Sequence, residues 1–506
     1  MNFPRAAGVL LHPTSLPGPH GVGDFGPEAH RFVDFLHSAG QKLWQVLPLN
    51  PTGYADSPFQ CFSASAGNPL LISLDRLADQ GILSREDLRS APAFPVENVD
   101  YGAVTRFKLP LLERAAKNFF ANASAEEHGR FEKFTHANGA WLDDFALFMA
   151  VKQAHGLVAW TNWPYDIAAR QHAAVKRWSE RLAAAIAAHK FFQYEFFKQW
   201  QQLRAYGRDR GIRIIGDVPI YVAHDSADVW SNRQFFLLDE RDHPLKIAGV
   251  PPDYFSATGQ LWGNPIYNWP LLNQSGYRWW IERLRSALRL YDIIRIDHFR
   301  GFEAYWEVPA DETTAINGRW VKGPGADLFS VLRKELGDLP IIAENLGVIT
   351  PEVEAIRHEF GFPGMAILQF AFGKDPQAPT FKPHNYVRDL VAYTGTHDND
   401  TVVGWWTSGG GDSTRTPEDV EKEHAYARSY LGFKDEPIHW VMIRGILSSV
   451  ATTAIAPMQD ILGLSSEARM NLPGVPSGYW KWRMKPGAAS DAIAARLREM
   501  VKLFDR

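Results

Sequence analysis

The chain has 506 residues, of which 45% are hydrophobic and 22% charged, and its formal net charge is −4. Nucleic acids and anionic membranes bind concentrated basic surfaces, so we expect neither as a partner of this nearly neutral chain. The single cysteine, Cys61, excludes an internal disulfide and favours a reducing compartment. The N-terminus does not resemble a signal peptide and no run of about twenty apolar residues occurs, so we expect a cytoplasmic protein.

Short apolar runs rich in Ile and Val recur along the chain and predict strands that are buried on both faces. Helical patterns lie between many of them, and the clearest covers residues 277–290, where apolar side chains recur with a 3.6-residue period. This alternation predicts an α/β fold, a (β/α)8 TIM barrel. The eight predicted strands lie at residues 8–11, 43–49, 212–222, 293–297, 304–308, 341–344, 365–370 and 391–394.

Two long stretches interrupt this alternation. Residues 51–210 are mostly helical in pattern, as in 141–155 and 196–210, and residues 223–276 are loop-rich. Each stretch follows the C-terminal end of a predicted strand, so we expect insertions at the C-terminal face, where barrels build their substrate clefts. The predicted organisation is a single catalytic unit, 1–506, with its barrel core at about 1–50, 211–222 and 290–506.

Four apolar runs end in a carboxylate, and two of these acids have a histidine as neighbour. The acids are Asp217, Asp297, Glu344 and Asp398, and the histidines are His298 and His397. Because parallel barrels carry their chemistry at the C-terminal ends of the strands, we expect these side chains to converge on one pocket. Several carboxylates in one pocket suit the acid, base and nucleophile roles of chemistry at a sugar carbon.

The positions of these acids indicate different roles. Arg295 precedes Asp297 by two residues, on the same side of a strand, and would keep that carboxylate ionised as a nucleophile. Glu344 follows an apolar run, where a raised pKa suits a general acid and base. Neighbouring strands lie about 4.8 Å apart, close to the carboxyl separation of about 5–5.5 Å in retaining glycosidases. Asp398 would bind sugar hydroxyls beside the reacting carbon.

The remaining polar residues have supporting roles in this hypothesis, and each has a structural alternative. Asp217 could order Arg295, while His298 and His397 could donate hydrogen bonds to the same sugar. The Arg295–Asp297 pair could also be a structural ion pair, and the histidines could be buried polar groups with satisfied hydrogen bonds. A metal site built from the acids and histidines is a further alternative, but no HxxxE or HxH pattern completes it.

Aromatic content is high, at 13% with 18 Trp, and several aromatics lie in Gly-, Pro- and Asn-rich segments. Most aromatic residues pack in cores, but aromatic rings in loops commonly contact a ligand, and a flat ring suits the face of a pyranose. A sugar site is therefore expected from composition and loop sequence alone.

Four motifs, taken together, resemble those of the 4-α-glucanotransferases, also called amylomaltases or disproportionating enzymes, of glycoside hydrolase family 77. They are GDVPIYV (216–222), RIDHFRG (295–301), AENLG (343–347) and THDND (396–400). The resemblance extends from LLHPTSLPG near the start to EARMNLPG near the end, and so covers essentially the whole chain. It implies Asp297 as the nucleophile, Glu344 as the general acid and base, and Asp398 as the transition-state stabiliser. The strand positions indicate the same roles. The resemblance also implies glucan contacts at Tyr54, Tyr101, Asp253, Trp262 and Asn471, beside Asp217, Arg295, His298 and His397.

The resemblance implies a retaining 4-α-glucanotransferase. Such an enzyme moves α-1,4-glucan segments between maltooligosaccharides through a glycosyl-aspartate intermediate, and releases glucose or forms longer or cyclic glucans. The Asn-His pair of α-amylases is missing after Asp217. This favours the transferase over the alternative, an α-1,4-glucan hydrolase of the α-amylase type. We also expect no metal and no cofactor. A non-catalytic glucan-binding barrel is disfavoured because all three acids are present.

Overall fold

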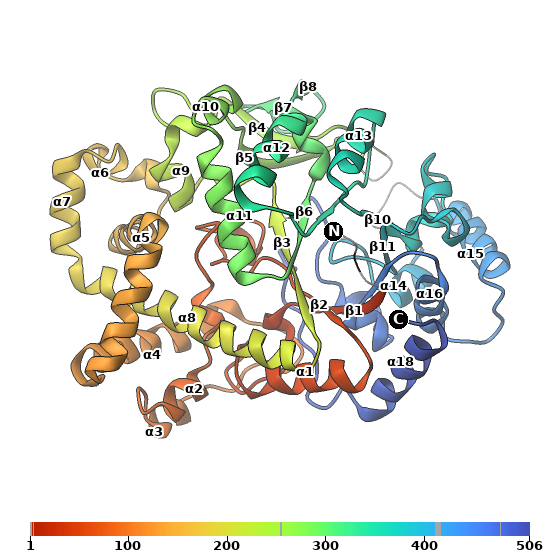
Figure 1. Cartoon of the computed structure of the whole chain (residues 1–506), viewed down its shortest axis with the longest axis horizontal. Helices are drawn as coiled ribbons and strands as arrows, with labels where there is room; N and C mark the ends of the chain where they lie inside the picture. The colour runs from red at the N-terminus through yellow and green to blue at the C-terminus, as the bar shows by residue number, and fades with distance from the viewer. Residues whose placement is uncertain (1–2, 4, 254–255, 410–415, 476) are drawn as a thin grey trace.

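Eight parallel strands form the centre of the molecule, with helices around them (Figure 1). The computed structural model describes residues 3, 5–253, 256–409, 416–475 and 477–506. The strand order is β10-β11-β12-β1-β2-β3-β6-β9, and every neighbouring pair is parallel. The strands are β1 Ala6–Leu10, β2 Leu43–Gln45, β3 Arg213–Pro219, β6 Ile293–Asp297, β9 Ile341–Ala343, β10 Gly364–Ile367, β11 Leu390–Tyr393 and β12 Thr453–Pro457.

The two edge strands of this sheet, β9 and β10, meet and nearly close it into a barrel. The Ala343 N–H donates to the Pro363 carbonyl at 2.9 Å, and the Met365 N–H donates to Asn345 Oδ1 at 2.8 Å. These contacts join the last strand in sheet order to the first, which removes the exposed edges that an open sheet would have. The fold is therefore the expected (β/α)8 barrel.

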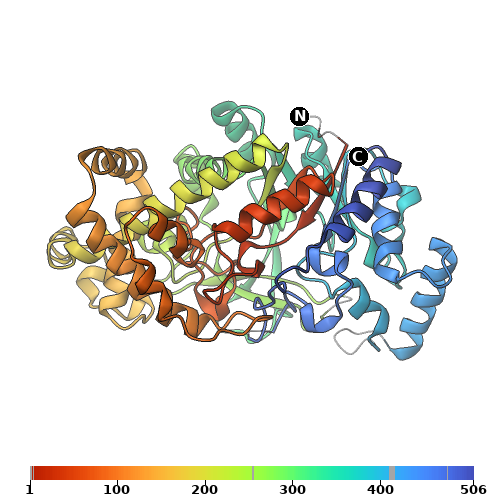
Figure 2. The ribbon, with the colours of Figure 1, turned by 90° about the horizontal axis from the view of Figure 1, so that it is seen from below.

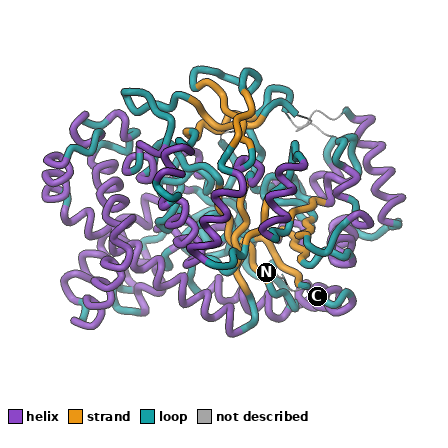
Figure 3. Tube along the Cα trace, turned by 45° about the horizontal axis from the view of Figure 1, so that its top comes forward, coloured by secondary structure: helices purple, strands orange, loops and turns teal. Residues whose placement is uncertain are grey.

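One predicted barrel strand was wrong, and one barrel strand was not predicted. Residues 304–308 belong to β7 (Ala304–Pro309), which lies in a separate antiparallel sheet of order β5-β4-β7-β8. The other members are β4 Lys246–Val250, β5 Gln260–Pro265 and β8 Arg319–Lys322. The eighth barrel strand is β12, whose sequence TAIAP has only one large apolar residue. Figure 3 shows the small sheet (orange) above the barrel strands.

Helices pack around the barrel, and a helical region extends from one side of it (left in Figure 1). That region follows β2 and contains three long helices, α4 Tyr101–Asn122, α5 Ala125–Ala154 and α8 Ala183–Asp209. The remaining helices are α1 Pro27–Ser38, α2 Leu74–Asp79, α3 Arg85–Arg89, α6 Tyr165–Ala168, α7 His172–Arg181, α9 Ala227–Ser231, α10 Trp269–Gln274, α11 Arg278–Leu290, α12 Gly325–Leu336, α13 Pro351–Phe360, α14 Val402–Thr407, α15 Pro417–Leu431, α16 Ile438–Ser448, α17 Met458–Ile461 and α18 Asp491–Leu503.

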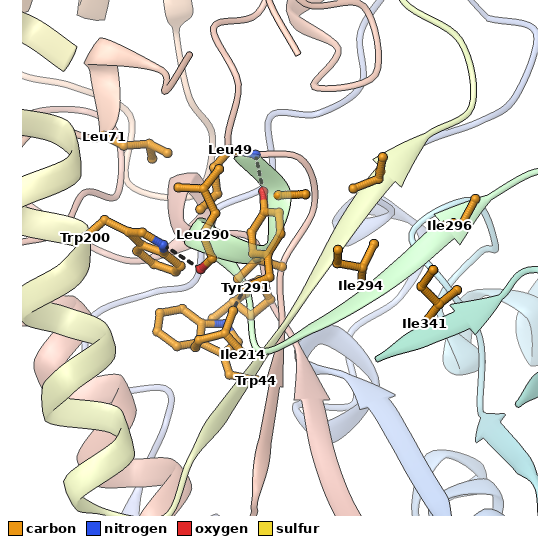
Figure 4. Packing of buried hydrophobic residues seen from close by; sticks show 14 of the residues in the cluster. Trp44, Leu49, Leu71, Trp200, Ile214, Leu290, Tyr291, Ile294, Ile296 and Ile341 are labelled. Carbon is orange, nitrogen blue, oxygen red and sulfur yellow. Dashed lines mark hydrogen bonds between the residues drawn. The ribbon is translucent and has the colours of Figure 1, made fainter. Parts of the chain in front are cut away.

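The helical region is anchored to the barrel by α8. Trp200 of this helix is fully buried, and its indole N–H donates to the Leu290 carbonyl at 2.9 Å, beside the ring of Trp44 on β2 (Figure 4). Such a contact fixes the direction of α8 against the start of β6. The insertion and the barrel thus share one continuous core.

Tyr291 packs flat over β3 at a position that only glycine allows. A Cβ atom on Gly216 would lie 2.1 Å from the Tyr291 ring. The hydroxyl of Tyr291 accepts a hydrogen bond from the Leu49 N–H at 3.2 Å (Figure 4). Because Gly216 directly precedes Asp217, this packing fixes the point along β3 at which the Asp217 side chain leaves the strand.

The first and last parts of the chain meet at the N-terminal ends of the strands, opposite the acids. Helix α18 packs on α1, and Figure 2 shows the two chain ends near each other. Arg506 donates to the Ala6 and Thr452 carbonyls, both at 3.2 Å, and so joins α18 to the barrel. Within the described residues, no helix has the length and apolar character needed to cross a bilayer.

Candidate active site

A cleft of about 810 Å³ opens at the C-terminal ends of the barrel strands. The three predicted catalytic acids, Asp297, Glu344 and Asp398, line it together. Of the predicted substrate contacts, Tyr54, Asp253, Trp262, Arg295, His298, His397 and Asn471 also line the cleft. The barrel therefore gathers residues that are hundreds of positions apart in the sequence into one site.

Arg295 connects two of the strand-end acids. Its register partner on β3 is Asp217, and its Nη1 donates to both Asp217 carboxylate oxygens at 2.8 and 2.7 Å. The same nitrogen lies 3.1 Å from Asp297 Oδ1. Asp217 and Arg295 are buried, whereas the Asp297 side chain is 27% exposed toward the cleft. Of the two acids that contact Arg295, Asp297 is therefore the one that is accessible from the cleft.

The pKa values in this group follow from burial and opposing charges. Burial raises the pKa of Asp217, and the negative charge of Asp297 adds to this, while Arg295 opposes both. Burial alone would lower the pKa of Arg295, but attraction by Asp217, Asp297 and Glu344 more than offsets burial and raises it. Arg295 is thus a permanent cation beside Asp297.

Glu344 stands next to Asp297 on the neighbouring strand. Ile296 and Ala343 are register partners, so the acids that follow them leave adjacent strands about 4.8 Å apart. The Glu344 carboxylate accepts from the His298 N–H at 2.7 Å and from the Leu346 N–H at 2.9 Å. Burial, with repulsion by Asp297, raises its pKa to about 7 despite Arg295 and these hydrogen bonds.

Asp398 approaches the cleft from the loop after β11. Its Oδ1 accepts from Asn471 Nδ2 at 2.7 Å, and its backbone carbonyl accepts from Arg469 Nη2 at 2.8 Å. The His397 Nε2 lies 3.4 Å from the other carboxylate oxygen. With a side chain 42% exposed, Asp398 is the most open of the three acids.

Aromatic rings hold both histidines in fixed planes. His397 stacks on Phe59 with ring centroids 4.9 Å apart and an angle of 17°, and Trp480 packs beside it at 5.9 Å. His298 meets Trp262 edge to face at 4.8 Å. Burial lowers the pKa of both rings, that of His298 to about 3, so both are neutral at physiological pH.

Two predicted substrate residues, Asp217 and Tyr101, do not line the cleft. Asp217 is buried and accepts from Arg295 instead. Tyr101 begins α4, is buried, and its hydroxyl donates to the Trp480 carbonyl at 3.0 Å. Tyr54, by contrast, is 72% exposed at the cleft. Asp253 also lines the cleft, and its carboxylate accepts from the Ser256 N–H at 2.9 Å.

Several site residues were not predicted from the sequence. Phe59 follows Tyr54 by five residues, and Arg469 lies inside the motif EARMNLPG, but nothing in their spacing indicates the histidine or the carbonyl that each contacts. Trp320 on β8 also lines the cleft, with the Arg300 guanidinium 3.7 Å from its ring centroid. Within the described ranges, no cluster of three or more His, Cys, Asp or Glu side chains could hold a metal ion.

Full-length relatives of similar sequence are described as 4-alpha-glucanotransferases. Residues 11–489 match the family model described as 4-alpha-glucanotransferase. A 4-alpha-glucanotransferase of Thermus thermophilus is 51% identical over 100% of both chains, and one of Synechocystis is 51% identical over 99% of this chain and 98% of the relative. The amylomaltase of Streptococcus agalactiae, solved in complex with acarbose, superposes with a TM-score of 0.93 at 42% identity over 99% of both chains. The chain therefore belongs to the 4-α-glucanotransferase family.

Proposed function

We propose that this enzyme transfers segments of α-1,4-glucan between maltooligosaccharides, with retention, through a covalent bond to Asp297. The observation that carries the proposal is the convergence of Asp297, Glu344 and Asp398 in one cleft, with Arg295 beside the first and a raised pKa at the second. Full-length relatives described as 4-alpha-glucanotransferases support transfer over simple hydrolysis. An amylomaltase solved with acarbose supports glucan-like substrates.

The first step breaks the donor glycosidic bond. The Asp297 carboxylate attacks the anomeric carbon while protonated Glu344 gives its proton to the leaving oxygen, which departs as the 4-hydroxyl of the released fragment. Arg295 places its positive charge 3.1 Å from the attacking Asp297 carboxylate, and burial keeps a proton on Glu344 near neutral pH. Asp398, His397 and Arg295 surround the position of the reacting sugar ring, where hydrogen bonds to its hydroxyls strengthen as positive charge develops.

The second step reverses these roles. Glu344, now ionised, removes the proton of an acceptor 4-hydroxyl, whose oxygen attacks the anomeric carbon and expels Asp297. Transfer requires that a bound glucan reaches the intermediate before water does. The cleft walls from the small sheet and the 54–60 segment, with Trp262, Trp320 and Tyr54, offer aromatic surface on which an acceptor can stack.

Incubation of the purified enzyme with maltotriose tests this function. Free glucose together with maltooligosaccharides longer than the substrate is the expected product pattern. New reducing ends without longer products would instead establish the hydrolase. Asp297→Asn should lower turnover by at least about three orders of magnitude, because it removes the nucleophile. Asp311→Asn, at an exposed acid outside the cleft, is the matched control and should leave turnover unchanged.

The covalent intermediate needs its own experiment. Mass spectrometry of Glu344→Gln incubated with a donor that carries a good leaving group should reveal a glycosyl adduct on the peptide containing Asp297. An adduct on another residue would contradict the nucleophile assignment.

We also infer a reducing compartment, such as the cytoplasm, because the one cysteine, Cys61, is buried and has no second cysteine with which to pair.

A further inference from the structure

A small cavity of about 20 Å³ lies beside His397, which also lines the cleft. It lies over the end of β12, and its wall includes His12, which follows β1, and His397, which follows β11. These strands flank β12 in the sheet. A cavity of this volume has room for one water molecule.

Two nitrogen atoms in this wall are buried without a hydrogen-bond partner among the described residues. They are His12 Nδ1 and His397 Nδ1. Both histidines are more than nine-tenths buried, at 6% and 5% exposure. Buried polar atoms are seldom left unpaired, because desolvation without a hydrogen bond costs about 1–3 kcal/mol. Thr396, Asn399 and Asp460 supply further polar groups around the same space.

We propose that one buried water joins His12 to His397, and that His12 is thereby a positioning residue for the sugar contact made by His397. His12 Nδ1–H donates to the water, and the water donates to His397 Nδ1. A histidine nitrogen that accepts a hydrogen bond leaves the proton on the other nitrogen. The proton of His397 is thus held on Nε2, the nitrogen that lies 3.4 Å from Asp398 Oδ2.

This tautomer matters because it decides what His397 offers to a substrate. Stacking on Phe59 already fixes the ring plane, so the tautomer determines whether Nε2 donates or accepts. A donor beside Asp398 complements a sugar hydroxyl whose own proton goes to that carboxylate. An acceptor would repel both the carboxylate and the hydroxyl oxygen. Burial lowers the pKa of His12 and His397, so the network operates with neutral rings.

The inference rests on the proposed function only for its effect on turnover, and its first test is independent of activity. Nitrogen-15 NMR of histidine-labelled enzyme, with His397 assigned by its loss in His397→Gln, reports which ring nitrogen carries the proton. We expect the Nε2–H form in the wild type. A proton on Nδ1 of His397 would overturn the proposal, whether or not the enzyme transfers glucan.

The second test compares variants at His12. His12→Phe keeps a ring but removes both nitrogens, so the preference of His397 for the Nε2–H form should weaken and kcat should fall about tenfold with little change in KM. His12→Asn places an amide donor at the former Nδ1 position and should recover much of the loss. The matched control is His20→Phe, at a buried histidine of the same segment that contacts Asp75 rather than the cavity.

The outcomes separate the two hypotheses. Unchanged kcat in His12→Phe, or an equal loss in His20→Phe, overturns the role of His12. A wild-type enzyme that makes no longer glucans from maltotriose refutes the proposed function instead, and leaves the tautomer measurement valid. If His12→Phe does not fold, the His12→Asn variant and the wild-type spectrum still decide the question.

Discussion

Replacing Arg295 by methionine should destabilise the enzyme as well as inactivate it. Methionine has a similar length but no charge. Among the described residues, Arg295 is the one hydrogen-bond donor to the Asp217 carboxylate, so Arg295→Met leaves that carboxylate buried, at 0% side-chain exposure, without a donor. Removing one partner of a buried ion pair typically costs about 3–5 kcal/mol. Unfolding entropy of about 2.1 cal/mol/K per residue, over the 506 residues, converts this into a fall in Tm of about 3–5 °C.

The loss should depend on pH with a definite sign. An acid whose folded-state pKa lies above its unfolded value of about 3.9 favours folding at low pH, and this advantage is lost as the pH rises toward the folded-state pKa. The pKa of Asp217 is already raised by burial, and losing Arg295 removes the charge that opposes this. The variant should therefore lose more stability at pH 8 than at pH 5.

Differential scanning calorimetry at both pH values measures this effect, and a double variant isolates its cause. Arg295→Met with Asp217→Asn removes the buried charge as well, so Tm should recover much of the loss, while activity stays low because Asp297 still lacks its cation. A single variant as stable as the wild type at pH 8, or a double variant no more stable than the single one, would refute the reasoning.

Three further predictions concern the acid, the core and the cleft. The kcat of maltotriose transfer should decline as the pH rises above about 7, because Glu344 must be protonated for the first step and its pKa is raised to about 7; a flat profile to pH 9 would contradict its role as the acid. Gly216→Ala should lower stability by about 1–3 kcal/mol through overlap with the Tyr291 ring, whereas Gly129→Ala, with open space in α5, should be neutral or stabilising in the same melting experiment. Trp262→Ala should raise KM for maltotriose about five- to tenfold through lost stacking on the sugar. Tyr101→Phe, which removes a hydroxyl outside the cleft, should change KM less. Equal effects of the two substitutions on KM would place Tyr101 among the direct substrate contacts.

Barrel strands were recognised from the sequence where their composition is distinctive. Ile293–Asp297 and Ile341–Ala343 are buried runs of Ile that end at the site acids, and sequence and structure agree closely on them. The strand β12 was missed because Ala, Thr and Pro give it no strong apolar pattern, although it is completely buried. The strand β7, which was wrongly placed in the barrel, has the sequence AYWEVP. Its Tyr, Trp and Val favour a strand in either kind of sheet, so the pattern alone could not assign it to one sheet or the other.

The sequence by itself determined the fold class and the family, because the alternation of strands and helices and the four motifs are local patterns. It also predicted Asp297, Glu344 and Asp398 as site acids, because an acid after a buried strand is a local pattern too. Only the tertiary structure decided which groups surround them. The bonds of Arg295 to Asp217, of Asn471 to Asp398 and of Tyr101 to Trp480 join residues that are 78, 73 and 379 positions apart. Contacts at such separations depend on barrel closure and loop packing, so no local pattern in the chain encodes them, and the raised pKa of Glu344 follows from the same long-range burial.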